Sequence, residues 1–223
     1  MPRLIAIGDI HGMSDALRQL LFRVDPQSND TIITLGDYID RGPDSKGVID
    51  QLIELATLCT TRHILGNHEE MTLAATTGRN DFFYWLKHGG DHTLKSYDLP
   101  APLRPSSAFD IRTLPDSHVR FFGSLMDFHE TDRFLFVHAG CDQDKPLLGQ
   151  GGQVLRWNSA QDGHKHMSGK VVVCGHSPRP YAQRTGQLWR VDTGAGVRPT
   201  GKLSAVDVLS GKVWSVPAGL PPY

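Results

Sequence analysis

The sequence predicts an α/β fold, and three observations support that prediction. Short apolar segments alternate with amphipathic helical patterns along the first third of the 223-residue chain. The alternation runs strand, helix, strand, helix, strand, which implies a parallel sheet with right-handed crossovers. Five apolar segments lead into glycine accompanied by aspartate, asparagine or histidine. Such polar side chains are expected to gather at one edge of a sheet.

The strands and helices of the first sheet can be assigned in order. The expected strands are residues 4–7 (LIAI), 31–35 (TIITL, rich in β-branched side chains) and 63–65 (HIL). Between them, residues 14–24 form a helix with Ser14 as the expected N-cap. Its apolar face consists of Leu17, Leu20, Leu21 and Val24. A second helix, residues 45–56, has an apolar stripe made of Val48, Ile49, Leu52, Ile53 and Ala56.

The rest of the chain is more varied. Residues 69–75 continue as helix, and residues 77–131 are rich in helical patterns interrupted by proline and serine. Further strands are expected at residues 134–137, 171–173 and 188–191, followed by a hairpin over residues 202–216 that turns near Ser210–Gly211. Residues 140–169 form a long polar segment with few strand or helix signals. A loop of that length within a domain is more often functional than idle.

Composition limits the kinds of protein that this chain can be. A chain of this length that is 39% hydrophobic can build one sizeable core, which predicts a single domain over residues 1–223. The 23 Lys and Arg against 24 Asp and Glu give a net charge of −1, which argues against general binding to nucleic acid or to an anionic membrane.

The expected compartment is the cytoplasm. No apolar stretch is long enough to span a bilayer, and the N-terminal segment turns polar too soon for a signal peptide. The cysteines have no CxxC spacing and no even pairing, which is typical of a reduced, intracellular protein. There are three, namely Cys59, Cys141 and Cys174.

Five predicted strand ends bring together a set of metal-binding residue types. The segments that follow the strands read GDIHG (8–12), GDYIDRG (36–42), GNHE (66–69), HAG (138–140) and GH (175–176). Ligands bind beyond the carboxyl ends of the strands in open α/β sheets, and glycine lets the backbone approach an ion or phosphate closely. The donors expected at this edge are Asp9, His11, Asp37, Asn67, His138 and His176.

This donor set indicates a pair of metal ions. Nitrogen and oxygen ligands without thiolate suit a divalent ion such as manganese, iron or zinc. Six ligands are too many for one ion that keeps an open position, so two ions that share a bridging carboxylate fit better. Two ions about 3.5–4 Å apart stabilise the attacking and leaving oxygens of an in-line displacement and activate a bound water. That chemistry is phosphoester hydrolysis.

The five motifs, in this order, resemble the phosphoprotein-phosphatase branch of the calcineurin-like metallophosphoesterases, and the bacterial Ser/Thr protein phosphatases most of all. Residues 85–97 and 191–208 also resemble that bacterial group. The branch includes the symmetrical diadenosine-tetraphosphate hydrolases. The resemblance implies a sandwich of two mixed β-sheets flanked by helices, with the ions at the edge where the strands end.

The resemblance also implies a role for each motif residue. Asp9 and His11 would bind the first ion and Asp37 would bridge both. The second ion would be completed by Asn67, His138 and His176. His68 would protonate the leaving oxygen while Asp40 holds its other ring nitrogen, and Arg41 would grip the phosphate through its planar guanidinium. Manganese is the expected metal, with iron or zinc as alternatives.

The sequence departs from the family pattern in two places. Relatives often carry Trp-x-Arg after the HAG motif, whereas this chain has Ser159 at the position of that arginine and Arg156 before Trp157. Arg156 therefore has two interpretations, a second phosphate contact or loop packing. Relatives usually have histidine two residues before the last ligand, and this chain has Cys174, which could alter packing near the metal.

Structural roles compete with several of these assignments. Asn67 could instead cap the helix that follows it, and His68 could be a satisfied structural histidine. Asp192, at another predicted strand end, is expected to be structural and to support a histidine from behind.

The predicted function is hydrolysis of phosphomonoesters by a metal-bridging hydroxide, with Ser/Thr phosphoproteins as the leading substrate on resemblance alone. The alternative is a symmetrical dinucleoside-tetraphosphate hydrolase, and a catalytically silent module that binds metal or phosphate ranks third. The partner is thus a phosphoprotein or a phosphorylated small molecule, with no nucleic acid and no membrane. A nucleobase would need apolar walls, for which the candidates are Phe82, Phe83, Tyr84 and Trp157, although these side chains could equally belong to the core.

Overall fold

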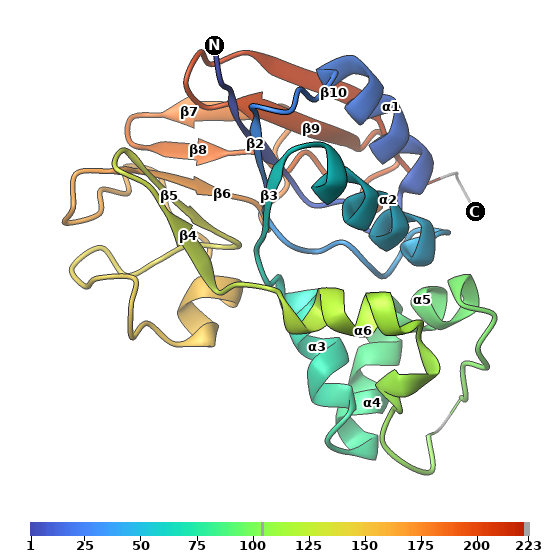
Figure 1. Cartoon of the computed structure of the whole chain (residues 1–223). Coiled ribbons are helices and arrows are strands. Elements are labelled where there is room, and N and C mark those ends of the chain that lie inside the picture. Colours follow the sequence, from blue (N-terminus) through green and yellow to red (C-terminus); the bar gives the residue numbers. More distant parts are fainter. Residues whose placement is uncertain (104, 221–223) are drawn as a thin grey trace.

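Two five-stranded mixed sheets lie face to face in the computed structural model, which describes residues 1–103 and 105–220 (Figure 1). The first sheet has the order β10 (Val213–Pro217), β9 (Lys202–Asp207), β1 (Leu4–Ile7), β2 (Thr31–Thr34), β3 (Thr60–His63). The second has the order β4 (Phe128–Glu130), β5 (Phe134–Val137), β6 (Val171–Cys174), β8 (Leu188–Arg190), β7 (Gln183–Thr185). Strands β1 to β3 run parallel, as do β5, β6 and β8. The predicted sandwich is confirmed.

The predicted third strand was displaced. It covers Thr60–His63 rather than residues 63–65, and Ile64 makes only an isolated bridge to Met126. The apolar pair at residues 64–65 suggested the strand. Pairing with β2, however, is made by the polar residues before it, because β3 is an edge strand with half of its side chains exposed. The short edge strands β4 and β7 gave no apolar signal in the sequence.

Helices α1 (Ser14–Val24) and α2 (Ser45–Leu58) lie where the apolar stripes predicted them. The N-cap of α1 is Met13 and makes no side-chain cap bond, so the prediction of Ser14 as the cap was wrong. The Ser14 hydroxyl lies one position inside the helix and accepts a hydrogen bond from Gln51 Nε2 at 2.9 Å. By contrast, the carboxylate of Asp44 caps α2, since it accepts from the Gly47 backbone N–H at 2.8 Å.

The alternation of side chains along the strands divides the core into layers. Ile5 and Ile7 face the helices that cover the first sheet, whereas Ala6 faces the second sheet. Phe134 and Phe136 likewise lie between the sheets. Both faces of the central strands are therefore buried, which explains why they read as unbroken apolar runs.

The outer face of the second sheet is covered mainly by the long polar segment after β5. Leu147, Leu155 and Ala160 from this segment pack against the strand residues Leu135 and Val172. The segment includes one short turn of π-helix, η3 (Gln153–Trp157). A few apolar residues of this segment thus cover the second sheet, as helices cover the first sheet. The largely polar composition of the segment did not indicate this role.

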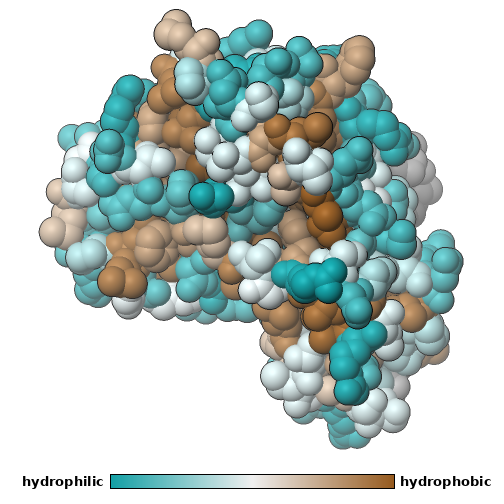
Figure 2. All heavy atoms as spheres, viewed as in Figure 1, coloured by the Kyte–Doolittle hydropathy of each residue, from teal (hydrophilic) through white to brown (hydrophobic). Residues whose placement is uncertain are grey.

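A group of helices projects from one end of the sandwich and forms a separate lobe in Figures 1 and 2. It comprises α3 (Asn67–Ala75), α4 (Arg79–Trp85), η1 (Leu86–Gly90), α5 (Asp91–Ser96), η2 (Ile111–Thr113) and α6 (Asp116–Gly123). Fully buried Trp85 stacks near Phe82 and Phe109, with ring centroids 6.0 and 5.2 Å away. In the part of the chain that the structure describes, no helix combines the length and apolar character needed to cross a bilayer.

Candidate metal centre

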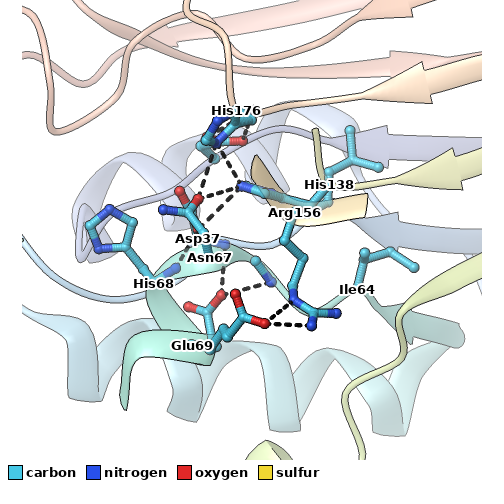
Figure 3. A network of polar contacts seen from close by, with 12 residues as sticks. Asp37, Ile64, Asn67, His68, Glu69, His138, Arg156 and His176 are labelled. Atoms are coloured by element: carbon cyan, nitrogen blue, oxygen red, sulfur yellow. Dashed lines mark hydrogen bonds and ion pairs between the residues drawn. The ribbon is translucent and has the colours of Figure 1, made fainter. Parts of the chain in front are cut away.

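The predicted donors meet where strands of both sheets end. His11 follows β1 and Asp37 follows β2 in the first sheet, while His138 follows β5 and His176 follows β6 in the second. Asn67 is the first residue of α3. Figure 3 shows Asn67, His138 and His176 pointing toward one another beside Asp37. The site therefore spans the junction between the two sheets.

Asp37 lies between two histidines. Its Oδ2 is 3.5 Å from His11 Nε2, and its Oδ1 is 3.4 Å from His138 Nε2. One carboxylate thus belongs to two groups of possible metal donors, His11–Asp37–His68 and Asp37–His138–His176. This arrangement is the one expected of a bridging ligand.

The tautomers of the two histidines are set by the backbone. His11 Nδ1 lies 3.0 Å from the carbonyl of Ile39, and His138 Nδ1 lies 2.7 Å from that of Leu35. Because a carbonyl only accepts, each Nδ1 must carry a hydrogen. Burial lowers the pKa of both imidazoles, which keeps them neutral at neutral pH and leaves a lone pair on each Nε2.

The second donor group is a cluster of acceptors. Asn67 Oδ1 is 2.9 Å from His138 Nε2 and 3.1 Å from His176 Nδ1, and the two ring nitrogens are 3.2 Å apart. Burial lowers the pKa of His176 to about 4, so this ring is also neutral. Lone pairs that face one another and a carboxylate are favourable when a cation lies among them, so these residues fit a divalent metal.

The alternative role for Asn67 was wrong. The N-cap of α3 is Gly66, and the Asn67 side chain is directed to the two histidines instead.

The carboxylate of Asp9 contacts the backbone of His176. Both of its carboxylate oxygens are 3.1 Å from the backbone N–H of His176, which donates to them. Burial raises the pKa of Asp9, and the nearby carboxylates of Asp192 and Asp37 raise it further. Asp9 is a member of neither donor group above, so its role as a ligand of the first ion stays a prediction.

His68 and Asp40 form a buried pair, with His68 Nδ1 2.7 Å from Asp40 Oδ2. Burial alone would lower the pKa of His68, but the charge of Asp37 and the hydrogen bond to Asp40 outweigh it, and the pKa is raised. The hydrogen bond to Asp40 thus stabilises the protonated form of the ring. The predicted pairing of these two side chains is present in the structure.

Two residues that hold Asp40 were missed in the sequence. Trp85 Nε1 donates to both Asp40 oxygens at 3.0 Å, and the Thr93 hydroxyl donates to Oδ1 at 2.6 Å. Both lie in residues 85–97, which resemble the bacterial family members, yet nothing in that stretch indicated their contact with a residue 45 and 53 positions away. They fix the carboxylate that orients His68.

Glu69 was also missed. It is fully buried and accepts the backbone N–H groups of Asp37 at 2.9 Å, Tyr38 at 2.8 Å and Gly66 at 3.1 Å. Burial raises the pKa of this carboxyl to about 8. Glu69 thus ties the loop after β2 to the start of α3, and its place in the GNHE motif was the available signal.

The site loops are strained. Among the described residues, seven non-glycine residues have positive φ, and five belong to the predicted site: His11, Asp37, Asp40, Arg41 and His176. Such conformations persist where the surrounding structure enforces them, and they cluster at functional sites. Gly36 also has a positive φ of +100°, and a Cβ there would lie 2.7 Å from the backbone of Gly66.

The two predicted phosphate-binding arginines differ in their surroundings. Arg41 is half-buried at the edge of the site, and its Nη1 is 3.1 Å from His11 Nε2. Arg156 instead donates to Glu70 Oε1 at 2.9 Å and to Asp127 Oδ1 at 2.6 Å. The structure thus engages Arg156 in ion pairs that pack the loop, and its contact with a phosphate stays a prediction.

Asp192 does not contact a histidine among the described residues. Its Oδ1 accepts from the Gly194 backbone N–H at 2.8 Å, and its Oδ2 is buried without a hydrogen-bond partner in that part of the chain. The predicted support of a histidine is replaced by a turn contact.

Comparison with known proteins decides the family. A family model described as calcineurin-like phosphoesterase matches residues 2–201. The chain belongs to this family. This confirms the resemblance inferred from the motifs.

Individual relatives of this calcineurin-like phosphoesterase fall into two groups. Serine/threonine-protein phosphatase 1 of Salmonella typhimurium is 42% identical over 87 residues, which is 38% of either chain. The symmetrical bis(5'-nucleosyl)-tetraphosphatase of Nitrosomonas europaea is 28% identical over 230 residues, covering 98% of this chain and 76% of the relative. Other symmetrical tetraphosphatases match over only 26% to 36% of their length. The chain thus spans less than two fifths of several curated relatives.

A solved structure, proposed to be a diadenosine tetraphosphatase, shares the fold. It superposes with a TM-score of 0.71 at 23% identity, covering 99% of this chain and 95% of the other.

Proposed function

We propose that this calcineurin-like phosphoesterase hydrolyses symmetrical dinucleoside tetraphosphates to nucleoside diphosphates. The match to the Nitrosomonas tetraphosphatase over 98% of this chain supports this substrate. The similarity to a Ser/Thr phosphatase covers 38% of the chain. The order of substrates expected from the sequence is therefore reversed.

The observation that carries the chemistry is the position of Asp37 between two sets of donors. In this proposal Asp9 and His11 hold one divalent ion, with Asp37 shared between the two. The other ion is held by Asn67, His138 and His176. The nitrogen and oxygen donors favour manganese, iron or zinc over softer metals. When bound, two such ions supply an activated water and neutralise charge on the phosphoryl group.

The protein side chains handle the phosphate and the proton. Arg41 approaches the phosphate oxygens through its planar guanidinium, which is free of carboxylate partners among the described residues. His68 donates a proton from Nε2 to the leaving oxygen, because its Nδ1 is held by Asp40 and its raised pKa favours the charged form. Trp85 and Thr93 keep Asp40 in place during that transfer.

A phosphoprotein phosphatase is the second candidate, and the 42% identity to the Salmonella enzyme favours it locally. The same ions, Arg41 and His68 would serve a phosphomonoester equally well. The cytoplasmic setting expected from the sequence suits either substrate.

The deciding experiment compares diadenosine tetraphosphate with a phosphoserine peptide in manganese buffer. We expect release of ADP from the dinucleotide, with kcat/KM far above that for the peptide. The opposite ranking would restore the phosphoprotein phosphatase. No turnover of either substrate, nor of p-nitrophenyl phosphate, with metals bound by elemental analysis would indicate a silent module.

A further inference from the structure

A cavity of about 520 Å³ opens beside Arg41, and neither the motifs nor the relatives assign it a role. Its remaining walls come from the turn between α4 and α5, the start of α5, the segment after β8 and Leu220 after β10, and they include Lys87, His88, His92 and Val197. A volume of this size is typical of small-molecule sites.

The cavity borders the candidate metal centre. Arg41 forms part of its wall and also contacts His11. Gly196 lines it from the other side, so close to the centre that a Cβ there would lie 2.6 Å from His11 Cβ. The cavity and the candidate centre thus share the surroundings of His11.

The backbone of the turn is shaped for this position. The π-helical turn η1 departs from helical geometry at His88 and at Gly89, where φ is +106°. As a result the Gly89 carbonyl accepts the backbone N–H of Arg41 at 3.3 Å, and a Cβ on Gly89 would lie 2.7 Å from that nitrogen. The turn joins the cavity wall to the strained loop that carries Arg41.

The cavity walls carry positive charge beside apolar surface. Lys87 is exposed, its Nζ lies 4.4 Å from the centre of the Phe83 ring, and no carboxylate among the described residues pairs with it. The wall also contains Asp91, whose carboxylate is 4.0 Å from His92 Nε2. Two permanent cations, Lys87 and Arg41, thus oppose one carboxylate. The apolar part of the wall consists of Leu86, Val197 and Leu220.

We propose that this cavity binds the leaving nucleoside diphosphate, with Lys87 on its phosphates and the apolar wall beside its nucleoside. The inference rests on the proposed function. Its direction follows from His68, which is the proton donor to the leaving oxygen and whose ring is 4.7 Å from that of His11, the residue that Arg41 and Gly196 contact. Water oxygen bonds to phosphorus, the bridging P–O bond breaks, and the departing diphosphate takes the proton from His68.

Lys87→Met tests the proposal, because it removes the charge and keeps most of the apolar stem. We expect kcat/KM for diadenosine tetraphosphate to fall about tenfold relative to that for p-nitrophenyl phosphate, whose leaving group is not a nucleotide, as expected for one charge-assisted contact. Lys212→Met is the matched control, since Lys212 is also exposed and also stacks on an aromatic ring, with Nζ 4.7 Å from the Trp214 centroid. It should leave the ratio unchanged.

A binding measurement separates this proposal from the proposed function. Calorimetric titration of ADP into the manganese-loaded protein should show about tenfold weaker binding to Lys87→Met than to wild type and Lys212→Met. Equal ADP affinity in all three proteins would overturn the cavity assignment, as would equal losses on both substrates. If wild type does not cleave the dinucleotide, the proposed function fails, and the ADP titration still decides the cavity. A loss confined to phosphopeptide substrates would assign the cavity to peptide and contradict our proposal.

Discussion

Arg41 was predicted to bind phosphate and Arg156 either to bind phosphate or to pack its loop, and the surroundings of the two side chains differ. Arg41 lies on a loop whose backbone is fixed by Glu69 and by Gly89, and its guanidinium contacts a neutral histidine. Arg156 lies on the long segment that covers the second sheet, where Glu70 and Asp127 neutralise it. A guanidinium without an acidic partner is available to an anion, whereas one already held by two carboxylates is engaged in packing. Residue type alone did not distinguish them.

Asp37→Asn should cause the largest loss of activity, against which the effects of the two arginine substitutions can be compared. The change weakens both donor groups at once, because each uses one oxygen of the same carboxylate. Activity should fall by at least about 10³-fold and bound metal should be lost together with it. Elemental analysis of the purified variant measures the metal, and unchanged content would contradict the bridging position.

Arg41→Ala tests the unpaired arginine directly. We expect kcat to fall about 10²–10³-fold, the usual cost of removing one preorganised group that stabilises developing charge. Metal content and thermal unfolding should stay close to wild type. A loss below about threefold would mean that Arg41 does not contact the phosphate.

Arg156→Met tests the paired arginine and should give the opposite pattern. Activity should change by less than about threefold, while the free energy of unfolding falls by about 1–2 kcal/mol because the charge-assisted hydrogen bonds to Glu70 and to the more exposed Asp127 are lost. Urea denaturation measures the stability. A loss of kcat comparable to that of Arg41→Ala, with stability unchanged, would restore Arg156 as the second phosphate contact.

The smallest effect concerns a histidine outside both arginine regions. Burial lowers the pKa of His63 to about 4, whereas an unfolded histidine has its ordinary value of 6.5. The unfolded chain therefore takes up the proton first, so this contribution to stability is complete above about pH 6.5 and is lost as the pH falls toward 4. Because His63 is partly exposed, we expect its titration to lower the free energy of unfolding by about 1–2 kcal/mol at pH 5, compared with pH 7.

His63→Gln supplies the comparison for this measurement. Its free energy of unfolding should fall less than that of wild type between pH 7 and pH 5, and parallel pH profiles for the two proteins would refute the shift. Activity at pH 7 should be unaffected, because Nδ1 of His63 contacts Thr34 rather than the candidate centre.

The sequence was most informative where burial is two-sided. The runs at residues 4–7, 134–137 and 171–174 are apolar throughout because both faces are covered, and their ends carry the donors beside glycine. The sequence was least informative where contacts between distant residues determine the position of a strand or the role of a side chain. The edge strand β3 is defined by its pairing with β2, and the contacts of Asp40 with Trp85 and Thr93 join residues 45 and 53 positions apart. The ion pairs of Arg156 also depend on how a polar loop folds back.

The donors of the candidate centre come from strands in opposite halves of the sandwich, which has a mechanical consequence. His11 and Asp37 move with one half, and His138 and His176 move with the other. Ions coordinated from both sides would cross-link the two sheets and resist sliding of one sheet over the other. Metal binding should then raise the melting temperature of the whole molecule by mass action. The same binding event would thus stabilise the fold and complete the site.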